Sequence, residues 1–149
     1  MNNCLTCRPA FKRLLICLSL GLAFGIFCAW SARGGNPEFA KIENYWLSAM
    51  AWVMIFNRML IGFVVFLAGA FKRHPIFGFR CFPFLRGTMM GVLVSLVNAI
   101  GILTVPGEQM WFGFWATITA GAIYGAIIDL VATKFAGEGA VLLWKEKES

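Results

Sequence analysis

The sequence contains four long apolar segments, at about residues 14–30, 45–71, 85–105 and 111–132. A helix rises 1.5 Å per residue, so about 20 apolar residues cross a hydrocarbon core of roughly 30 Å. All five prolines fall outside these segments, where a missing backbone donor does least harm. We therefore expect four transmembrane helices in one domain that covers residues 1–149.

The composition agrees with burial in lipid. Of the 149 residues, 60% are apolar and 13% are charged, whereas soluble domains average about 45–50% and about 25%. So few charges cannot cover the exterior of a water-soluble domain. The composition also argues against a disordered chain and a disulfide-rich secreted protein. We expect an all-α fold, an integral membrane bundle of four antiparallel transmembrane helices, in a bacterial inner (plasma) membrane.

Basic residues are distributed unequally among the segments that flank the spans. With four spans, three flanks share one side of the membrane, and they hold ten of the thirteen Lys and Arg residues: Arg8, Lys12, Arg13, Lys72, Arg73, Arg80, Arg86, Lys134, Lys145 and Lys147. The other side holds Arg33 and Lys41. Because Lys and Arg are retained on the cytoplasmic side, both termini are expected to be cytoplasmic, that is N-in and C-in.

The tryptophans favour the same orientation. Five of them lie at the span ends that this topology places outside: Trp30, Trp46, Trp52, Trp111 and Trp115. Tryptophan is enriched at the membrane–water interface, where its ring is buried and its N–H is hydrated. The charges and the aromatic residues thus predict one topology.

The first apolar segment has a second interpretation. A basic N-terminus, an apolar stretch and the small residues Ala29, Ser31 and Ala32 are also typical of a cleaved signal peptide. The stretch is long for a signal core, and Gly21 and Gly25 are spaced as packing residues. Cleavage would leave three spans and a non-cytoplasmic N-terminus.

Small residues recur along one side of the predicted helices. In the last two spans Gly87 and Gly91, and likewise Gly121 and Gly125, are four residues apart. Residues at this spacing face the same way on a helix. Because apolar side chains gain little by leaving lipid, membrane helices associate where small residues let their backbones approach. We expect these four glycines to form helix contacts.

Arg58 lies near the middle of the second apolar segment. A lipid-facing Arg there would cost about 2.5 kcal/mol or more, so its side chain is expected to point into the bundle. Asn98 and Thr119 lie at a similar depth. We predict a central polar layer of Asn57 or Arg58, Asn98, and Thr117 or Thr119, in which amides and hydroxyls satisfy the guanidinium donors.

A purely structural role for Arg58 is the alternative. The second apolar segment is longer than one span requires, so the helix can slide outward or tilt. If it begins at Trp52, Arg58 lies about two turns from the outer interface. Its side chain can then extend toward Glu43 or Glu108 and anchor the span.

Asp129 is the one carboxylate within an apolar segment. It lies near the predicted cytoplasmic end, about ten residues or roughly 15 Å from the depth of Arg58, so we do not expect these two to pair. The expected counter-ion is Lys134 or a basic residue of the connection 72–86. We expect Asp129 to order the cytoplasmic end of the bundle; a proton or cation site is the alternative.

The connection 72–86 combines four basic residues, Lys72, Arg73, Arg80 and Arg86, with interleaved phenylalanines. Near a bilayer each basic residue is attracted to anionic headgroups by about 1 kcal/mol, and the rings can enter the acyl boundary. We expect this connection to lie on the membrane surface. Orientation and lipid contact then account for the net charge of +6, and no nucleic-acid partner is expected.

The chain carries no catalytic motif such as a phosphate-binding glycine loop, G-x-S-x-G or H-E-x-x-H. Cys4 and Cys7, with His74 and Cys81, form a weak candidate set of metal ligands, but reduced cytoplasmic thiols are the expectation. We therefore expect no enzyme activity, no metal and no cofactor.

These features favour a small multi-pass membrane protein that acts through helix packing, as an accessory or structural component. Its expected partners are the lipid bilayer with its anionic headgroups and either further copies of itself or a membrane partner subunit. The alternative is a small homo-oligomeric transporter or channel that uses the intramembrane polar residues, because four spans are few to enclose a path. No motif assigns the chain to a family.

Overall fold

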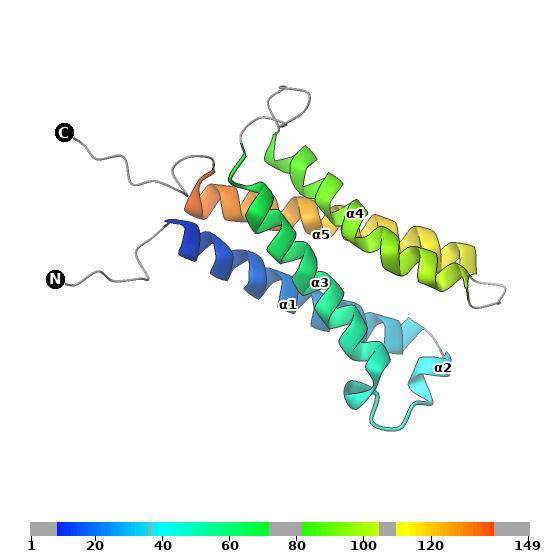
Figure 1. Cartoon of the computed structure of the whole chain (residues 1–149). Helices are drawn as coiled ribbons and strands as arrows, with labels where there is room; N and C mark the ends of the chain where they lie inside the picture. Colours follow the sequence, from blue (N-terminus) through cyan, green and yellow to red (C-terminus); the bar gives the residue numbers. More distant parts are fainter. Residues whose placement is uncertain (1–8, 36, 72–81, 105–109, 139–149) are drawn as a thin grey trace, which may run out of the picture.

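The computed structural model describes residues 9–35, 37–71, 82–104 and 110–138. In this part of the chain all regular secondary structure is helical (Figure 1). The elements are α1 (Pro9–Gly35), α2 (Pro37–Ala40), η2 (Tyr45–Leu47), α3 (Ala49–Ala68), α4 (Pro83–Leu103) and α5 (Met110–Ala136). The four long helices are each apolar and long enough to cross a membrane, which confirms the all-α class and the number of candidate spans.

α3 begins later than the apolar pattern indicates. The pattern predicts a span over 45–71, but the helix starts at Ala49 because Ser48 caps it: the Ser48 hydroxyl accepts a hydrogen bond from a backbone N–H of the first turn at 3.4 Å. Tyr45 lies in the short turn η2, 1% exposed, and donates a hydrogen bond to the carbonyl of Ala29 at 3.0 Å. An apolar residue count cannot separate this packed turn from the helix that follows.

α1 and α5 extend beyond the predicted ranges 14–30 and 111–132. The added turns carry polar residues, among them Arg13 and Thr133, that a hydropathy criterion excludes from a span. These polar turns are the ones that position the site described below.

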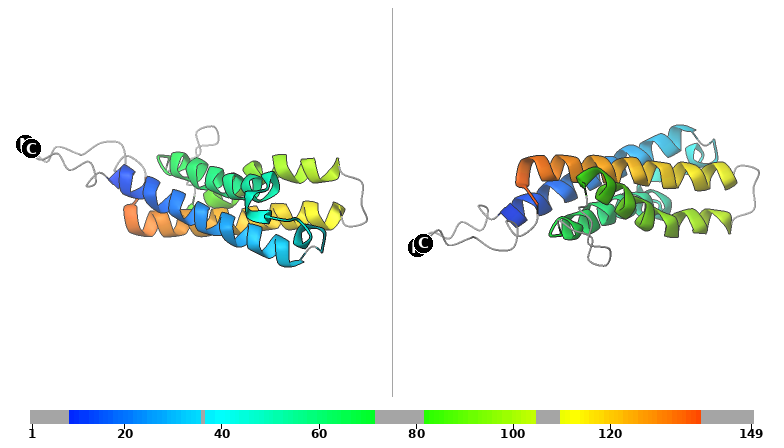
Figure 2. Two further views of the ribbon diagram at one scale, coloured as in Figure 1. Left: turned by 90° about the horizontal axis from the view of Figure 1, so that it is seen from below. Right: turned by 90° about the horizontal axis from the view of Figure 1, so that it is seen from above.

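The long helices associate as two close pairs, α1 with α3 and α4 with α5 (Figures 1 and 2). In the first pair the backbones touch: a Cβ atom at Gly25 would lie 2.8 Å from Ile55 Cα, and one at Gly62 would collide with the Cys17 carbonyl. Later residues of α1 therefore contact earlier residues of α3.

The second pair uses the four glycines predicted as packing residues. A Cβ at Gly121 would lie 2.7 Å from the Gly91 carbonyl oxygen, and one at Gly87 would lie 2.8 Å from the Gly125 carbonyl carbon. Real Cβ atoms do not approach so closely, so only glycine permits this backbone contact. The structure thus places all four residues between α4 and α5.

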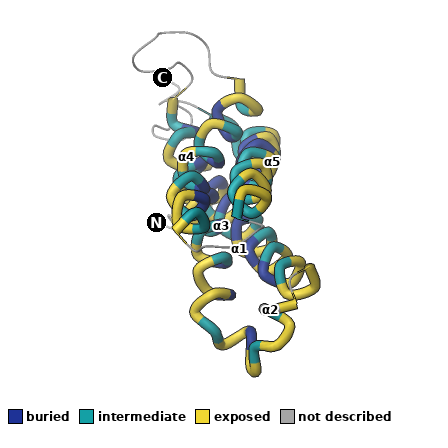
Figure 3. Tube along the Cα trace, turned by 90° about the vertical axis from the view of Figure 1, so that its right-hand side faces the viewer, coloured by how far each residue is buried: buried dark blue, intermediate teal, exposed yellow. Residues whose placement is uncertain are grey.

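Burial follows a narrow stripe on each long helix (Figure 3). Many large apolar side chains are exposed. The buried residues of α1 recur every four positions: Arg13, Cys17, Gly21, Gly25 and Ala29. Val97 and Phe112, in contrast, are 74% and 75% exposed. Small residues inside and large apolar residues outside are typical of helices that pack in lipid.

We expect Gly91→Ala to destabilise the protein by about 1–3 kcal/mol, because the new methyl group meets the α5 backbone and the helices must separate. Gly101→Ala is the matched control: it lies on the same helix, no atom of another described helix lies within 4 Å of its Cβ position, and alanine favours helix. Thermal unfolding in detergent micelles measures both. Equal unfolding temperatures would contradict the close α4–α5 contact.

Candidate functional site

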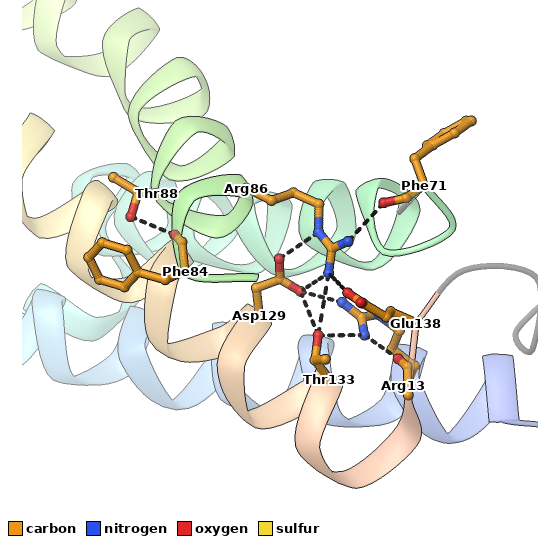
Figure 4. Close-up of polar contacts among 9 residues, drawn as sticks. Arg13, Phe71, Phe84, Arg86, Thr88, Asp129, Thr133 and Glu138 are labelled. Atoms are coloured by element: carbon orange, nitrogen blue, oxygen red, sulfur yellow. Dashed lines mark hydrogen bonds and ion pairs between the residues drawn. The ribbon is translucent and has the colours of Figure 1, made fainter. Parts of the chain in front are cut away.

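A charged cluster lies where the first turns of α1 and α4 meet the last turns of α5 (Figure 4). It consists of Arg13, Arg86, Asp129, Thr133 and Glu138. Asp129 and Thr133 are four residues apart on α5, so their side chains face the same way. Arg13 reaches them from α1 and Arg86 from α4, which joins three helices through one carboxylate.

Asp129 accepts hydrogen bonds from both arginines. Arg86 binds it through two nitrogens, with Nε 2.7 Å from Oδ2 and Nη2 3.0 Å from Oδ1. Arg13 Nη2 and the Thr133 hydroxyl also donate to Oδ1, the hydroxyl at 3.3 Å. Bidentate, charge-assisted hydrogen bonds fix both distance and orientation. The Asp129 carboxylate is therefore fixed relative to the Arg86 guanidinium.

The same arginines bind the ends of two helices. Arg86 Nη1 donates to the Phe71 carbonyl at 2.8 Å, and Arg13 Nη1 donates to the Gly137 carbonyl at 2.6 Å. These carbonyls follow α3 and α5, where a helix leaves acceptors without partners. Gly137 has φ 77°, a left-handed conformation that suits glycine after a helix end. A Cβ at Gly69 would collide with the Arg13 guanidinium, so glycine there makes room for it. The cluster thus contacts all four long helices.

The cluster is buried and formally neutral. Arg13 and Asp129 are 0% exposed and Arg86 is 4% exposed. Glu138, which is 18% exposed at the edge of the cluster, supplies the second carboxylate, with Oε2 3.1 Å from Arg86 Nη2. Two guanidinium groups therefore face two carboxylates. Buried charges are tolerated when they are paired and hydrogen-bonded, and removing one member leaves another uncompensated, so these residues depend on one another.

Arg58 forms a second polar contact, deeper in the bundle. It is the tenth of the 20 residues of α3 and is 4% exposed. Its Nη1 donates to Ser95 Oγ at 2.8 Å and to Asn57 Oδ1 at 3.2 Å, and its Nη2 donates to Cys28 Sγ at 3.8 Å. Its Cζ lies 5.3 Å from the ring centroid of Tyr124, a cation–π contact. Like the charged cluster, this guanidinium contacts all four long helices.

Arg58 differs from the charged cluster in its net charge. Among the residues that the structure describes, no carboxylate pairs with it. Its Nε, like the Nε of Arg13, has no hydrogen-bond partner in the described ranges. The guanidinium is therefore stabilised by polar side chains and by the face of an aromatic ring, and not by a carboxylate. The Tyr124 ring is held by stacking on Phe24, with centroids 4.6 Å apart. The result is a positive charge near the middle of a candidate span.

Of the predicted central layer, the structure joins only Asn57 to Arg58. Asn98 and Thr117 are half-buried and Thr119 is exposed. Within the described part of the chain, no hydrogen bond links these three residues to Arg58. The prediction matched residues by depth alone, and depth does not fix which side of a helix faces the bundle.

The outward alternative for Arg58 also differs from the observed geometry. The guanidinium points into the bundle toward Ser95, and its ion pairs within the described residues do not include Glu43, which is exposed. Glu108 lies outside the described residues. Side chains inside the bundle bind the guanidinium through a hydroxyl, a thiol and a ring. Arg58 therefore does not need to extend to the membrane–water interface.

The prediction that Arg86 lies on the membrane surface is wrong. Arg86 is 4% exposed in the first turn of α4, and its side chain binds Asp129 of α5 in place of the membrane surface. It is therefore the basic counter-ion expected for Asp129, whereas Lys134 is exposed. The other three residues of that prediction, and the candidate metal ligands, lie outside the described residues: Lys72, Arg73, Arg80, Cys4, Cys7, His74 and Cys81.

The sequence analysis did not single out Arg13, Ser95, Thr133 or Tyr124 as site residues. A signal existed for some of them: two further steps of four before Gly21 reach Arg13, and one further step after Asp129 reaches Thr133. Ser95 continues the four-residue step from Gly87 to Gly91. Nothing in the spacing indicated that Tyr124 offers its ring to a cation.

Comparison with known proteins finds no match among family models, curated proteins or solved structures. The two polar contacts are therefore the features that bear on function. Within the described residues no group of three or more His, Cys, Asp or Glu side chains is placed to hold a metal ion.

We expect Asp129→Asn to lower the free energy of unfolding by about 3–5 kcal/mol, because it leaves two buried guanidinium groups with one carboxylate. Lys134→Gln is the control, since it removes one charge from an exposed residue of the same helix and should change stability by less than about 0.5 kcal/mol. Chemical unfolding in micelles measures both. If the two variants unfold alike, the ion pairs do not hold the helix ends together.

Proposed function

We propose that this chain is a small multi-pass membrane protein of a bacterial inner membrane that acts through helix packing, as an accessory or structural component. In this proposal its four spans are antiparallel and both termini are cytoplasmic. The observation that carries the proposal is the charged cluster, which uses buried ionisable side chains to join the ends of four helices. Each of these side chains is already bound to another helix of the chain, as a packing role requires.

The orientation is supported by where charges and tryptophans lie. The cluster arginines mark the end at which α1 and α4 begin and α3 and α5 end (Figure 1). The tryptophans of the opposite end are all exposed: Trp30, Trp46, Trp52, Trp111 and Trp115. Basic residues favour the cytoplasmic side, and exposed tryptophans favour an interface.

A packing role is supported by the way the interior is filled. Within each pair, glycines bring backbones into direct contact. Between the pairs, the space is occupied by side chains that bind one another, such as Arg58 with Ser95 and Phe24 with Tyr124. An interior of this kind suits a component whose outer surfaces contact lipid and other membrane helices.

One observation favours the alternative of a small homo-oligomeric transporter or channel. Arg58 carries a buried positive charge that no carboxylate of the described residues balances. Intramembrane ionisable residues often mark ion pathways. An anion would be the solute that such a charge attracts.

The orientation predicts the outcome of reporter fusions. A fluorescent protein fused after Ser149 should fluoresce, and alkaline phosphatase fused there should be inactive, because the first folds in the cytoplasm and the second needs an oxidising compartment. Fusions after Glu43, in the opposite connection, should give the reverse result. Active phosphatase after Ser149 would contradict the proposed topology.

A flux assay separates the two functions. Purified protein in liposomes should pass chloride no faster than protein-free liposomes. Chloride flux that is present in the wild type and lost in Arg58→Leu would establish the transporter in place of the packing component.

A further inference from the structure

Glu138 is held in the charged cluster less firmly than Asp129 (Figure 4). Its Oε2 lies 3.1 Å from Arg86 Nη2, but this oxygen forms no hydrogen bond with any residue in the described ranges. Asp129 is 0% exposed and accepts two hydrogen bonds from Arg86, whereas Glu138 is 18% exposed. The Glu138 carboxylate is therefore held by charge attraction at the edge of the cluster, and not by hydrogen bonds.

Arg86 retains an unused hydrogen-bond donor. A guanidinium has five N–H groups. Nε and one N–H of Nη2 donate to Asp129, and Nη1 donates to the Phe71 carbonyl. The second N–H of Nη2 donates to Thr133 at 3.3 Å. The fifth N–H, on Nη1, has no acceptor within the described part of the chain, although Arg86 is only 4% exposed. A buried donor without an acceptor is costly, so an anion with several acceptor oxygens satisfies Arg86 better than Glu138 does.

The helix ends around the cluster have the features of a lipid headgroup region. Lys134, in the last turn of α5, is exposed. Four phenylalanines at the ends of α3, α4 and α5 are 58–63% exposed: Phe71, Phe82, Phe84 and Phe135. Such rings suit the acyl boundary, and basic pockets between transmembrane helices on the cytoplasmic side bind anionic headgroups. In the proposed orientation the cluster lies on that side.

We propose that the Glu138 carboxylate occupies a binding site for the phosphate group of an anionic phospholipid, and that the lipid displaces it. A phosphodiester carries one negative charge, as the carboxylate does, so the exchange leaves the cluster formally neutral. Its free oxygens can accept paired hydrogen bonds from a guanidinium. The inference rests on the proposed packing function and orientation, and it extends them by naming a lipid and its site.

The exchange requires little movement of the chain. Gly137 precedes Glu138, and its carbonyl accepts a hydrogen bond from Arg13 Nη1 at 2.6 Å. Its own N–H donates to the Thr133 carbonyl at 3.0 Å. The backbone at the end of α5 is thus held independently of the Glu138 side chain. Because Asp129 still binds both arginines, the helices stay joined when the Glu138 side chain turns away.

The test is a titration of the purified full chain, in micelles of a neutral detergent, with short-chain phosphatidylglycerol. Binding is measured as a rise in the unfolding temperature, because a ligand of the folded state stabilises it. Short-chain phosphatidylcholine, which has no net charge, and inorganic phosphate, which is not a lipid, should each raise it less at the same concentration. These two probes separate an anionic lipid from any lipid and from a free anion.

Glu138→Gln removes the competing carboxylate. It should lower the apparent dissociation constant for phosphatidylglycerol about fivefold, the effect of losing one partly exposed ion pair. Glu43→Gln is the matched control, since it makes the same change at an exposed residue of the opposite end and should leave the constant unchanged.

Glu138→Asp gives a second variant that keeps the negative charge of the cluster. Its side chain is one methylene shorter and reaches Arg86 less well, so its dissociation constant should lie between those of the wild type and Glu138→Gln.

Several results would overturn the lipid site. They are equal dissociation constants for the wild type and Glu138→Gln, an equal tightening in Glu43→Gln, and an equal effect of phosphatidylcholine or of inorganic phosphate. Loss of folding in both Glu138 variants would also overturn it, because the carboxylate would then not be displaceable. None of these results changes the reporter or chloride outcomes, so failure of the lipid site and failure of the proposed function are distinguishable.

Discussion

The arrangement of the four helices depends on one carboxylate, Asp129, that two arginines from different helices share. Apolar side chains gain little by leaving lipid, so hydrophobic burial alone cannot specify which helices meet. Glycine contacts specify the partners within each pair, α1 with α3 and α4 with α5. Polar contacts then join the pairs, because Arg13 of α1 binds Asp129 of α5 and Arg58 of α3 binds Ser95 of α4.

The charged cluster and the Arg58 contact stabilise buried arginines in different ways. Near the helix ends, the charged cluster balances its charges and also satisfies carbonyl groups that α3 and α5 leave free. Near mid-span, Arg58 is held by a hydroxyl, an amide, a thiol and a ring, each of which is neutral. The first arrangement pairs each guanidinium with a carboxylate, whereas the second leaves a positive potential inside the bundle.

Apolar length and small-residue spacing were sufficient to predict four candidate spans and the glycines between α4 and α5. They could not predict the start of α3, because the packed turn at Tyr45 is as apolar as a helix. The sequence pattern predicted Arg86 at the membrane surface. A surface arginine and a buried arginine that pairs with a carboxylate cannot be told apart from the sequence near a span end. The difference depends on which side of α4 faces α5 at Arg86, and composition does not show this.

The unequal lengths of the helices have a consequence for the surrounding lipid. α1 and α5 each have 27 residues, whereas α3 and α4 have 20 and 21. At 1.5 Å per residue the longer helices measure about 40 Å and the shorter ones about 30 Å, close to one hydrocarbon thickness. Across one bilayer the longer helices therefore lean or protrude further than the shorter ones. Each close pair joins one longer to one shorter helix, so this difference in length falls within both pairs.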